Sequence, residues 1–309
     1  MGRHGCSFGP GPWDPDRRFE TSCLIGPLPL SICRAAMFLY AFVTLVFVIG
    51  YSCSSPPSSL ESSITNKSNT TTTNTNSTDP SQPQNLDFAT AGCTSVARSF
   101  SYFTVLSYWG LAFYFLVAAL HSLSYARSAP KSLLARLPRP LQALHSLFYS
   151  SVVVFPLIVS IVFWAVLYRN WFLSAYDAWR NISQHTLNSA FALFEIIVPR
   201  TEPLPWIHLL WLAAILLAYL AVAFITLAHQ GFYTYDFLDY RRAGSRGRVA
   251  GYVLGITAAL VIFFCAVHFL ILLRIWLTET KLGLDAKHAR EPVLVADIES
   301  ADVEAKASK

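Results

Sequence analysis

Apolar runs of about 20 residues recur along the chain, and they constrain its fold more than any other feature. A run of that length is long enough to cross the hydrocarbon core of a bilayer as a helix. Charged residues make up only 13% of the chain, about half the proportion in soluble domains. The sequence therefore predicts an all-α, polytopic membrane helical bundle with about six transmembrane helices. The expected spans are Ala35–Tyr51, Ser99–Ala126, Gln142–Tyr168, Asn181–Val198, Trp206–Leu227 and Val249–Leu273.

Polar segments flank and interrupt this membrane domain. Residues 1–33 are rich in Pro and Gly and predict a disordered cytosolic tail, residues 34–284 form the membrane domain, and residues 285–309 form a charged C-terminal tail. Residues 54–95 are largely low-complexity Ser, Thr, Asn and Pro sequence, which predicts a disordered linker because it cannot bury enough apolar area to fold. This linker carries three N-glycosylation sequons, which favour a lumenal or extracellular location and a glycoprotein. They begin at Asn66, Asn69 and Asn76.

Basic residues predict which side of the membrane each loop occupies. The loop after the second span holds Arg127, Lys131, Arg136 and Arg139 and no acid, which favours the cytosol. Six crossings would then put both termini in the cytosol. The connection 231–248 opposes this pattern, because its four Arg residues would be lumenal. If segment 181–198 is re-entrant, the Arg-rich loop becomes cytosolic and the C-terminus lumenal. Six crossings are favoured, because first spans tend to dominate orientation.

Charge and cysteine usage narrow the function classes. The net charge of +5 lies mostly beside apolar runs, so it indicates topology and not nucleic-acid binding. No Cys-x-x-Cys or Cys/His metal spacing, Gly-rich phosphate loop or Gly-x-Ser-x-Gly elbow occurs, and we expect neither a metal nor a cofactor. Cys53 and Cys93 flank the linker and either form a lumenal disulfide or remain two unpaired thiols.

The fourth span is the most polar of the six. Read as a helix, it places Asn181, Gln184, His185, Asn188 and Glu195 within an arc of roughly 100°. In a membrane protein, such a polar stripe usually faces the interior of the bundle. We therefore expect this segment to be the functional helix.

Chemistry becomes possible where this helix meets the second span. Thr104 and His185 lie within one or two turns of the same lumenal surface, which would suit a nucleophile and its base. Asp236 or Asp239 emerges at that level and would orient the imidazole. Structural alternatives are a Thr104 that bonds to its own backbone and a His185 that joins neighbouring helices. Glu195 is a neutral buried acid, a proton-relay member or the ion-pair partner of Arg200.

Three segments resemble one known family. They are Phe103-Thr104 with the apolar helix that follows, Asn181-Ile-Ser-Gln-His185-Thr186 with Glu195 ten residues after the His, and Gly231-Phe-Tyr-Thr-Tyr235-Asp-Phe237-Leu238-Asp239. Together they resemble the androgen-induced protein family, which includes the androgen-dependent regulator of tissue factor pathway inhibitor. The resemblance covers about residues 35–284. Ile182 stands where some members have a second His, so His185 is the only imidazole in the motif.

The resemblance implies a multipass hydrolase of lipid esters, namely fatty-acid esters of hydroxy fatty acids, in the endomembrane system. Thr104 would be the nucleophile and His185 the general base, while Asn181 and Asn188 are the nearest amides for an oxyanion. The substrate would enter from the bilayer. A non-enzymatic membrane protein with a structural or signalling role is the alternative. A transporter that uses Glu195 lacks the support of an internal repeat.

Overall fold

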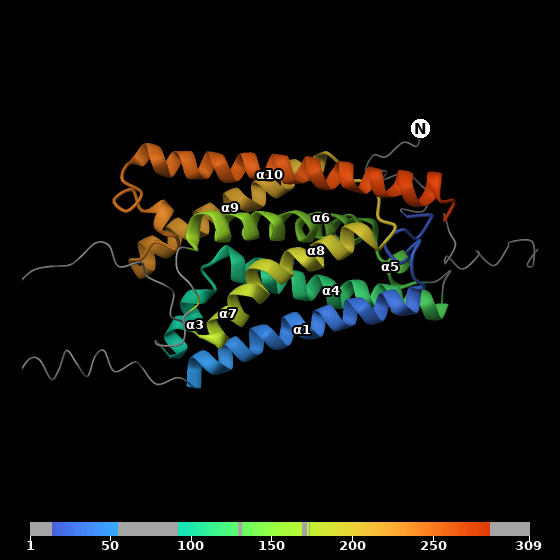
Figure 1. The fold of residues 1–309 in the computed structure, drawn as a ribbon, viewed down its shortest axis with the longest axis horizontal. Helices are drawn as coiled ribbons and strands as arrows, with labels where there is room; N and C mark the ends of the chain where they lie inside the picture. The colour runs from blue at the N-terminus through green and yellow to red at the C-terminus, as the bar shows by residue number, and fades with distance from the viewer. Residues whose placement is uncertain (1–13, 55–91, 129–131, 169–171, 173, 285–309) are drawn as a thin grey trace, which may run out of the picture.

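The computed structural model describes residues 14–54, 92–128, 132–168, 172 and 174–284. Its helices run nearly parallel to one long axis (Figure 1). The long elements are α1 (Pro27–Ser54), α4 (Phe103–Ser128), α6 (Arg139–Val162), α9 (Ile207–Gln230) and α10 (Arg246–Ile275). The shorter helices are α3 (Cys93–Ser99), α5 (Leu133–Arg136), α7 (Ala175–Ile182) and α8 (Asn188–Ile197). Three π-helical segments, Phe163–Leu167, Ser183–Leu187 and Trp276–Lys281, extend or join these helices, and Asp236–Leu238 is a 3₁₀ turn.

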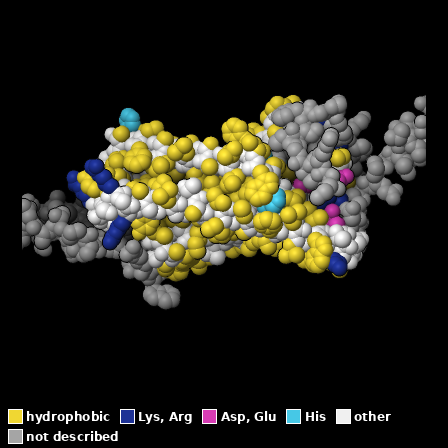
Figure 2. Space-filling view, turned by 90° about the horizontal axis from the view of Figure 1, so that it is seen from above, with side chains coloured by type: hydrophobic (Ala, Val, Ile, Leu, Met, Phe, Trp, Pro, Cys, Tyr) yellow, Lys and Arg dark blue, Asp and Glu magenta, His cyan; other side chains and the backbone are white. Residues whose placement is uncertain are grey.

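The predicted fold class is confirmed. Within the described residues, five helices are long and apolar enough to cross a membrane by themselves, and no strand occurs. The fourth span is composite, because α7, the π segment Ser183–Leu187 and α8 follow one another without a break. Large apolar side chains are exposed along the helices, among them Leu210, Leu217 and Leu254. Figure 2 shows hydrophobic side chains along the middle of one face and charged ones near its two ends, as a bilayer-spanning protein requires.

Contacts at both ends of the composite span show that it crosses the whole bundle. At its beginning, the ring of Tyr176 lies 4.1 Å from that of Tyr51 at the end of α1. At its far end, the backbone carbonyl of Val198 accepts a hydrogen bond from Ser22, which precedes α1. The composite segment therefore runs from one end of the bundle to the other, which favours a crossing span over a re-entrant one.

We call the end of the bundle that holds Cys53 and Cys93 the linker end, and the end that holds residues 14–26 the N-terminal end. The two cysteines form a disulfide, which decides between the alternatives of a bond and two unpaired thiols. The Arg-rich loop between α9 and α10 lies at the linker end too (Figure 1). Its Arg242 lies 2.6 Å from Asp236 and 3.9 Å from Asp239, so acids partly neutralise the charge that opposes the positive-inside tendency. The sequons at Asn66, Asn69 and Asn76 lie outside the described residues.

The tail prediction is wrong for residues 14–33. Helix α1 begins at Pro27, before the predicted start, and residues 14–26 pack on the N-terminal end of the bundle. Glu20, Thr21 and Ser22 are buried there, and the amide of Arg200 donates to the carbonyl of Thr21 at 2.9 Å. Composition did not reveal this docking, because it depends on polar contacts with segments far along the chain. Residues 1–13 and 285–309, which were predicted to be polar tails, lie outside the described residues.

We expect this docked segment to loosen as the pH rises. Burial raises the pKa of Glu20 from 4.5 to about 7, while a hydrogen bond from Ser132 and the charges of Arg17 and Arg34 lower it, and that of Asp14 raises it. The folded state therefore holds a proton that the free segment releases above about pH 4.5. Its stabilising effect is full below that pH and is lost as the pH rises through about 7. Tryptic cleavage at residues 17–18 should accelerate over this range.

The control for this measurement is Glu20→Gln, which cannot ionise. The ratio of wild-type to Glu20→Gln cleavage rates removes the pH dependence of trypsin itself. A ratio that stays constant between pH 5 and 8 would contradict the assignment.

Helix α6 forms the centre of the bundle. It packs against α4, α8, α9 and α10, while α1 lies along α4 (Figure 1). Its residues Val152, Val153, Phe155, Ile158 and Val159 are all buried. Because α6 contacts both the second and the fourth spans, the positions of Thr104 and His185 along the bundle can be compared by their contacts with α6.

Candidate functional site

Thr104 lies in the first turn of α4 and lines an apolar cavity of about 290 Å³ near the linker end. Helices α4, α6, α9 and α10 and the loop 231–245 supply its walls. Leu217 lines the same cavity and is 68% exposed, so the cavity opens on the lipid-facing surface of α9. Its volume is at the lower limit for ligand pockets. A ligand longer than this cavity would therefore extend past Leu217 to the outer surface of α9.

Tyr235 is the polar neighbour of Thr104 in this cavity. Its phenol oxygen accepts a hydrogen bond from the amide of Phe103 at 3.1 Å. Thr104, the next residue, lies close to that oxygen and lines the same cavity. Tyr235 belongs to the sequence motif 231–239. The sequence prediction assigned the acids of that motif to His185 and gave Tyr235 no role.

His185 lies in the π-helical segment that joins α7 to α8. Its imidazole stacks on the ring of Phe163, with 3.5 Å between the ring centroids and 2° between the planes. The imidazole is buried, and its Nδ1 has no hydrogen-bond partner. An unpartnered buried ring nitrogen is costly and needs a reason. π-Helical segments inside α-helices are frequent at functional sites, and this one holds the His on which the sequence prediction depends.

Thr104 and His185 lie at the same level of α6. Thr104 shares the cavity wall with Ile158 and Val162. His185 accepts a hydrogen bond from Ser160 at its backbone carbonyl and stacks on Phe163, the residue after Val162. Helix α4 also packs against the π segment that carries His185. His185 is not among the residues that line the cavity of Thr104, and no hydrogen bond joins these two side chains in this structure.

The predicted supporting residues are engaged elsewhere. Asn181 donates to the carboxylate of Asp177 at 2.8 Å, one turn earlier on α7. The side-chain oxygen of Asn188 accepts from Ser160 at 3.2 Å. Asp239 accepts from the amide of Arg241 at 2.9 Å, within its own loop. The predicted Asp–His pair is therefore not formed, because Asp239 accepts within its own loop and Nδ1 of His185 has no partner.

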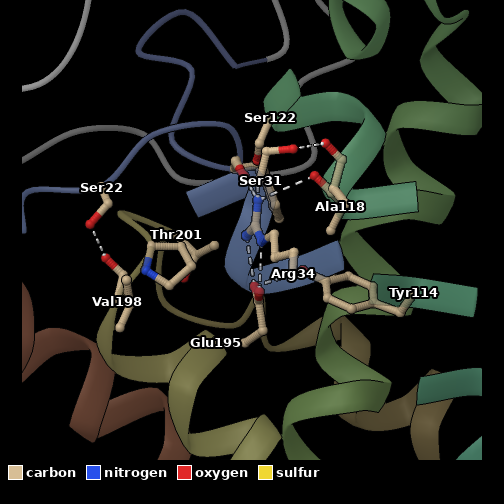
Figure 3. Close-up of polar contacts among 12 residues, drawn as sticks. Ser22, Ser31, Arg34, Tyr114, Ala118, Ser122, Glu195, Val198 and Thr201 are labelled. Carbon is tan, nitrogen blue, oxygen red and sulfur yellow. Dashed lines mark hydrogen bonds and ion pairs between the residues drawn. The ribbon is translucent and has the colours of Figure 1, made fainter. Parts of the chain in front are cut away.

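Glu195 belongs to a different polar centre, shown in Figure 3. Arg34 binds both of its carboxylate oxygens, with Nε–Oε1 at 2.7 Å and Nη2–Oε2 at 2.8 Å. Tyr114 donates to Oε2 at 3.0 Å, and Ser122 accepts from Arg34 at 2.6 Å. Both charged side chains are completely buried. Of the three roles expected for Glu195, the ion pair with Arg200 is wrong, since Glu195 pairs with Arg34 and Arg200 lies 3.9 Å from Glu279.

This second centre ties α1, α4 and α8 together near the N-terminal end, so it is structural. A carboxylate held on both oxygens by a guanidinium is a poor candidate for an exchanging ion site. Arg34 was missed by sequence reasoning because a charge at the start of an apolar run normally marks the membrane surface. The sequence feature that could have revealed Arg34 is Glu195, an acid within a membrane span that needs a cation as its partner.

A family model described as FAR-17a/AIG1-like protein matches residues 68–273, which include Thr104, His185 and Tyr235. The match begins in the linker and ends within α10. No curated protein and no solved structure matches the chain.

Proposed function

Because the chain belongs to the FAR-17a/AIG1-like family, we propose that this membrane protein hydrolyses lipid esters, specifically fatty-acid esters of hydroxy fatty acids. One observation carries the proposal. Thr104 faces an apolar cavity open to the lipid side, and a buried imidazole with an unpartnered nitrogen lies at the same level of the bundle. A hydroxyl in an apolar, lipid-accessible cavity suits an ester that partitions into the bilayer.

In this mechanism the Thr104 hydroxyl attacks the ester carbonyl carbon. Its proton passes to His185, because a hydroxyl does not ionise by itself near neutral pH. The C–O bond to the hydroxy fatty acid then breaks, and that leaving oxygen takes the proton back from His185. Water, activated by the same imidazole, hydrolyses the acyl-threonine and releases the fatty acid. Catalytic hydrogen bonds often form only in the substrate complex, which accounts for their absence in the empty site.

This chemistry requires access to both lipid and water, and the position of the site along the bundle supports both. Thr104 is in the first turn of its helix, close to the linker end, where water can reach the acyl-enzyme. The exposed side of the cavity, marked by Leu217 and Thr257, faces lipid. We propose the endomembrane system as the location and its lumen as the side of the linker end.

A fluorophosphonate probe tests the proposal directly. Applied to membranes that contain the full chain, it should label Thr104, identified by mass spectrometry of the adduct, and an excess of the ester substrate should compete. Endoglycosidase treatment should shift the labelled band, because the three sequons of the linker would be lumenal.

Thr257 provides the matched control for this experiment. It lines the same cavity, but its hydroxyl donates to the carbonyl of Val253 in its own helix at 2.9 Å. Thr257→Ala should label as wild type does, and Thr104→Ala should not label. Equal labelling of all three proteins would contradict the assignment of Thr104.

A non-enzymatic structural role is the second candidate. The observation that favours it is the missing hydrogen bond between Thr104 and His185 in a bundle already locked by Arg34 and Glu195. On that view, probe labelling and ester hydrolysis are both absent, and His185→Ala lowers the abundance of folded protein.

A further inference from the structure

Tyr235 lies in the loop that follows α9, whereas Thr104 lies in α4. Helix α9 ends at Gly231, whose φ of 72° is a left-handed conformation that favours glycine. The chain then turns back toward the bundle, and Tyr235 packs between the rings of Tyr102, at 5.6 Å, and Phe237, at 5.0 Å. These contacts fix the ring, and with it the phenol oxygen beside Thr104.

The start of α4 polarises this phenol. The first N–H groups of a helix have no intrahelical acceptor, and they carry the positive end of the helix dipole. The amide of Phe103 is one of them, and it donates to the Tyr235 oxygen. An oxygen that accepts such bonds becomes a stronger donor through its own O–H. Burial raises the pKa of Tyr235, so the phenol keeps its proton at neutral pH.

Tyr219 is the second phenol of this cavity. It lies beside Tyr235, with 6.4 Å between the ring centroids. Tyr219 donates its own proton to the carbonyl of Ser101 at 2.9 Å, so that proton is not directed at the cavity. Both rings line the cavity. A carbonyl oxygen that enters the cavity beside Tyr235 can accept a hydrogen bond from its O–H.

We propose that Tyr235 is the oxyanion donor for attack by Thr104, an inference that rests on the proposed hydrolase function. When Thr104 Oγ bonds to the carbonyl carbon, the C=O π electrons move to the carbonyl oxygen, and the Thr104 proton passes to His185. The carbonyl and attacking oxygens share one carbon, so the donor must lie beside the nucleophile, as Tyr235 does. Its O–H stabilises that oxygen until the C=O bond re-forms and the alkoxide leaves with the His185 proton. The side-chain amide of Asn181, which the sequence favoured, donates instead to Asp177, and neither Asn181 nor Asn188 lines the cavity that holds Thr104.

The test compares Tyr235→Phe with wild type in the full-length protein, using a fatty-acid ester of a hydroxy fatty acid. Phenylalanine keeps the ring contacts and removes the donor. We expect kcat to fall by about 10²- to 10³-fold, the usual effect of deleting one oxyanion donor. KM, the thermal stability and the Kd for an analogue with an ether in place of the ester should stay within about twofold, because these do not depend on a developing oxyanion.

Tyr252→Phe is the matched control, since its ring also packs on Phe237, at 5.4 Å, and it should keep wild-type kcat. An unchanged kcat in Tyr235→Phe overturns the inference. A loss of kcat accompanied by weaker ether binding or lower stability also overturns it, because that pattern indicates a structural role. Failure of the proposed function itself looks different: wild type would not hydrolyse the ester, or Thr104→Ala would hydrolyse it equally well.

Discussion

Thr104→Ala and His185→Gln should each lower kcat/KM for a hydroxy-fatty-acid ester by about 10⁴-fold or more. A hydroxyl needs its base to become a nucleophile, and the base has no task without the hydroxyl, so the two act as a unit. The double variant should therefore be no slower than the slower single variant. The measurement is steady-state hydrolysis by purified protein in detergent or vesicles, with the folded fraction determined for each variant.

His121 offers a matched control for the imidazole. It is buried, and its Nδ1 has no hydrogen-bond partner, as in His185, but it lies near the opposite end of the bundle beside His145. His121→Gln should keep turnover close to wild type. Multiplicative effects of the Thr104 and His185 variants would show that the residues act independently, and the nucleophile–base assignment would then fail.

Removing either partner of the buried ion pair should lower the free energy of unfolding by about 3–5 kcal/mol. Glu195→Ala leaves the guanidinium of Arg34 buried without its two carboxylate bonds, and Arg34→Ala leaves the carboxylate without its cation. The double variant Arg34→Met, Glu195→Leu should recover most of the loss, because it leaves no uncompensated charge. Reversible unfolding in mixed micelles measures the three changes.

The chain also contains an exposed ion pair of similar length for comparison. Arg242 and Asp236 lie 2.6 Å apart with side chains 42% and 55% exposed, whereas Arg34 and Glu195 lie 2.7 Å apart and are fully buried. Asp236→Ala should cost at most about 1 kcal/mol. Similar costs for the exposed and buried pairs would mean that Arg34 relaxes to water in the variant, which would contradict the structural role given to the pair.

The helical fold could be predicted closely from the sequence, whereas the partners of its polar side chains could not. Apolar runs set the existence and approximate length of each span, because a bilayer-crossing helix satisfies its backbone within one continuous segment. Helix α1 is the exception, since its predicted start at residue 35 followed the charge of Arg34. That charge is internal in the structure, because Glu195, 161 positions away, neutralises it.

The sequence likewise predicted residues of the candidate site but not the partners of their side chains. The motif around Asn181 and His185 was readable because its spacing lies within one helix, and the sequence alone nominated Thr104 and His185. It could not show that Asp239 turns to its own loop or that Tyr235 lies beside Thr104. Side-chain partners depend on how each helix is rotated and on where each loop folds back, and neither property has a period along the chain.

The sequence by itself thus determined that the chain is a bundle of about six membrane helices with a polar fourth span, since hydrophobic length and helical periodicity are local properties. Only the tertiary structure decided that residues 14–26 dock, that Arg34 holds Glu195, and that a phenol adjoins the Thr104 hydroxyl. These outcomes join segments tens to hundreds of positions apart. They follow from buried polar groups, which must find a partner wherever packing brings one within reach.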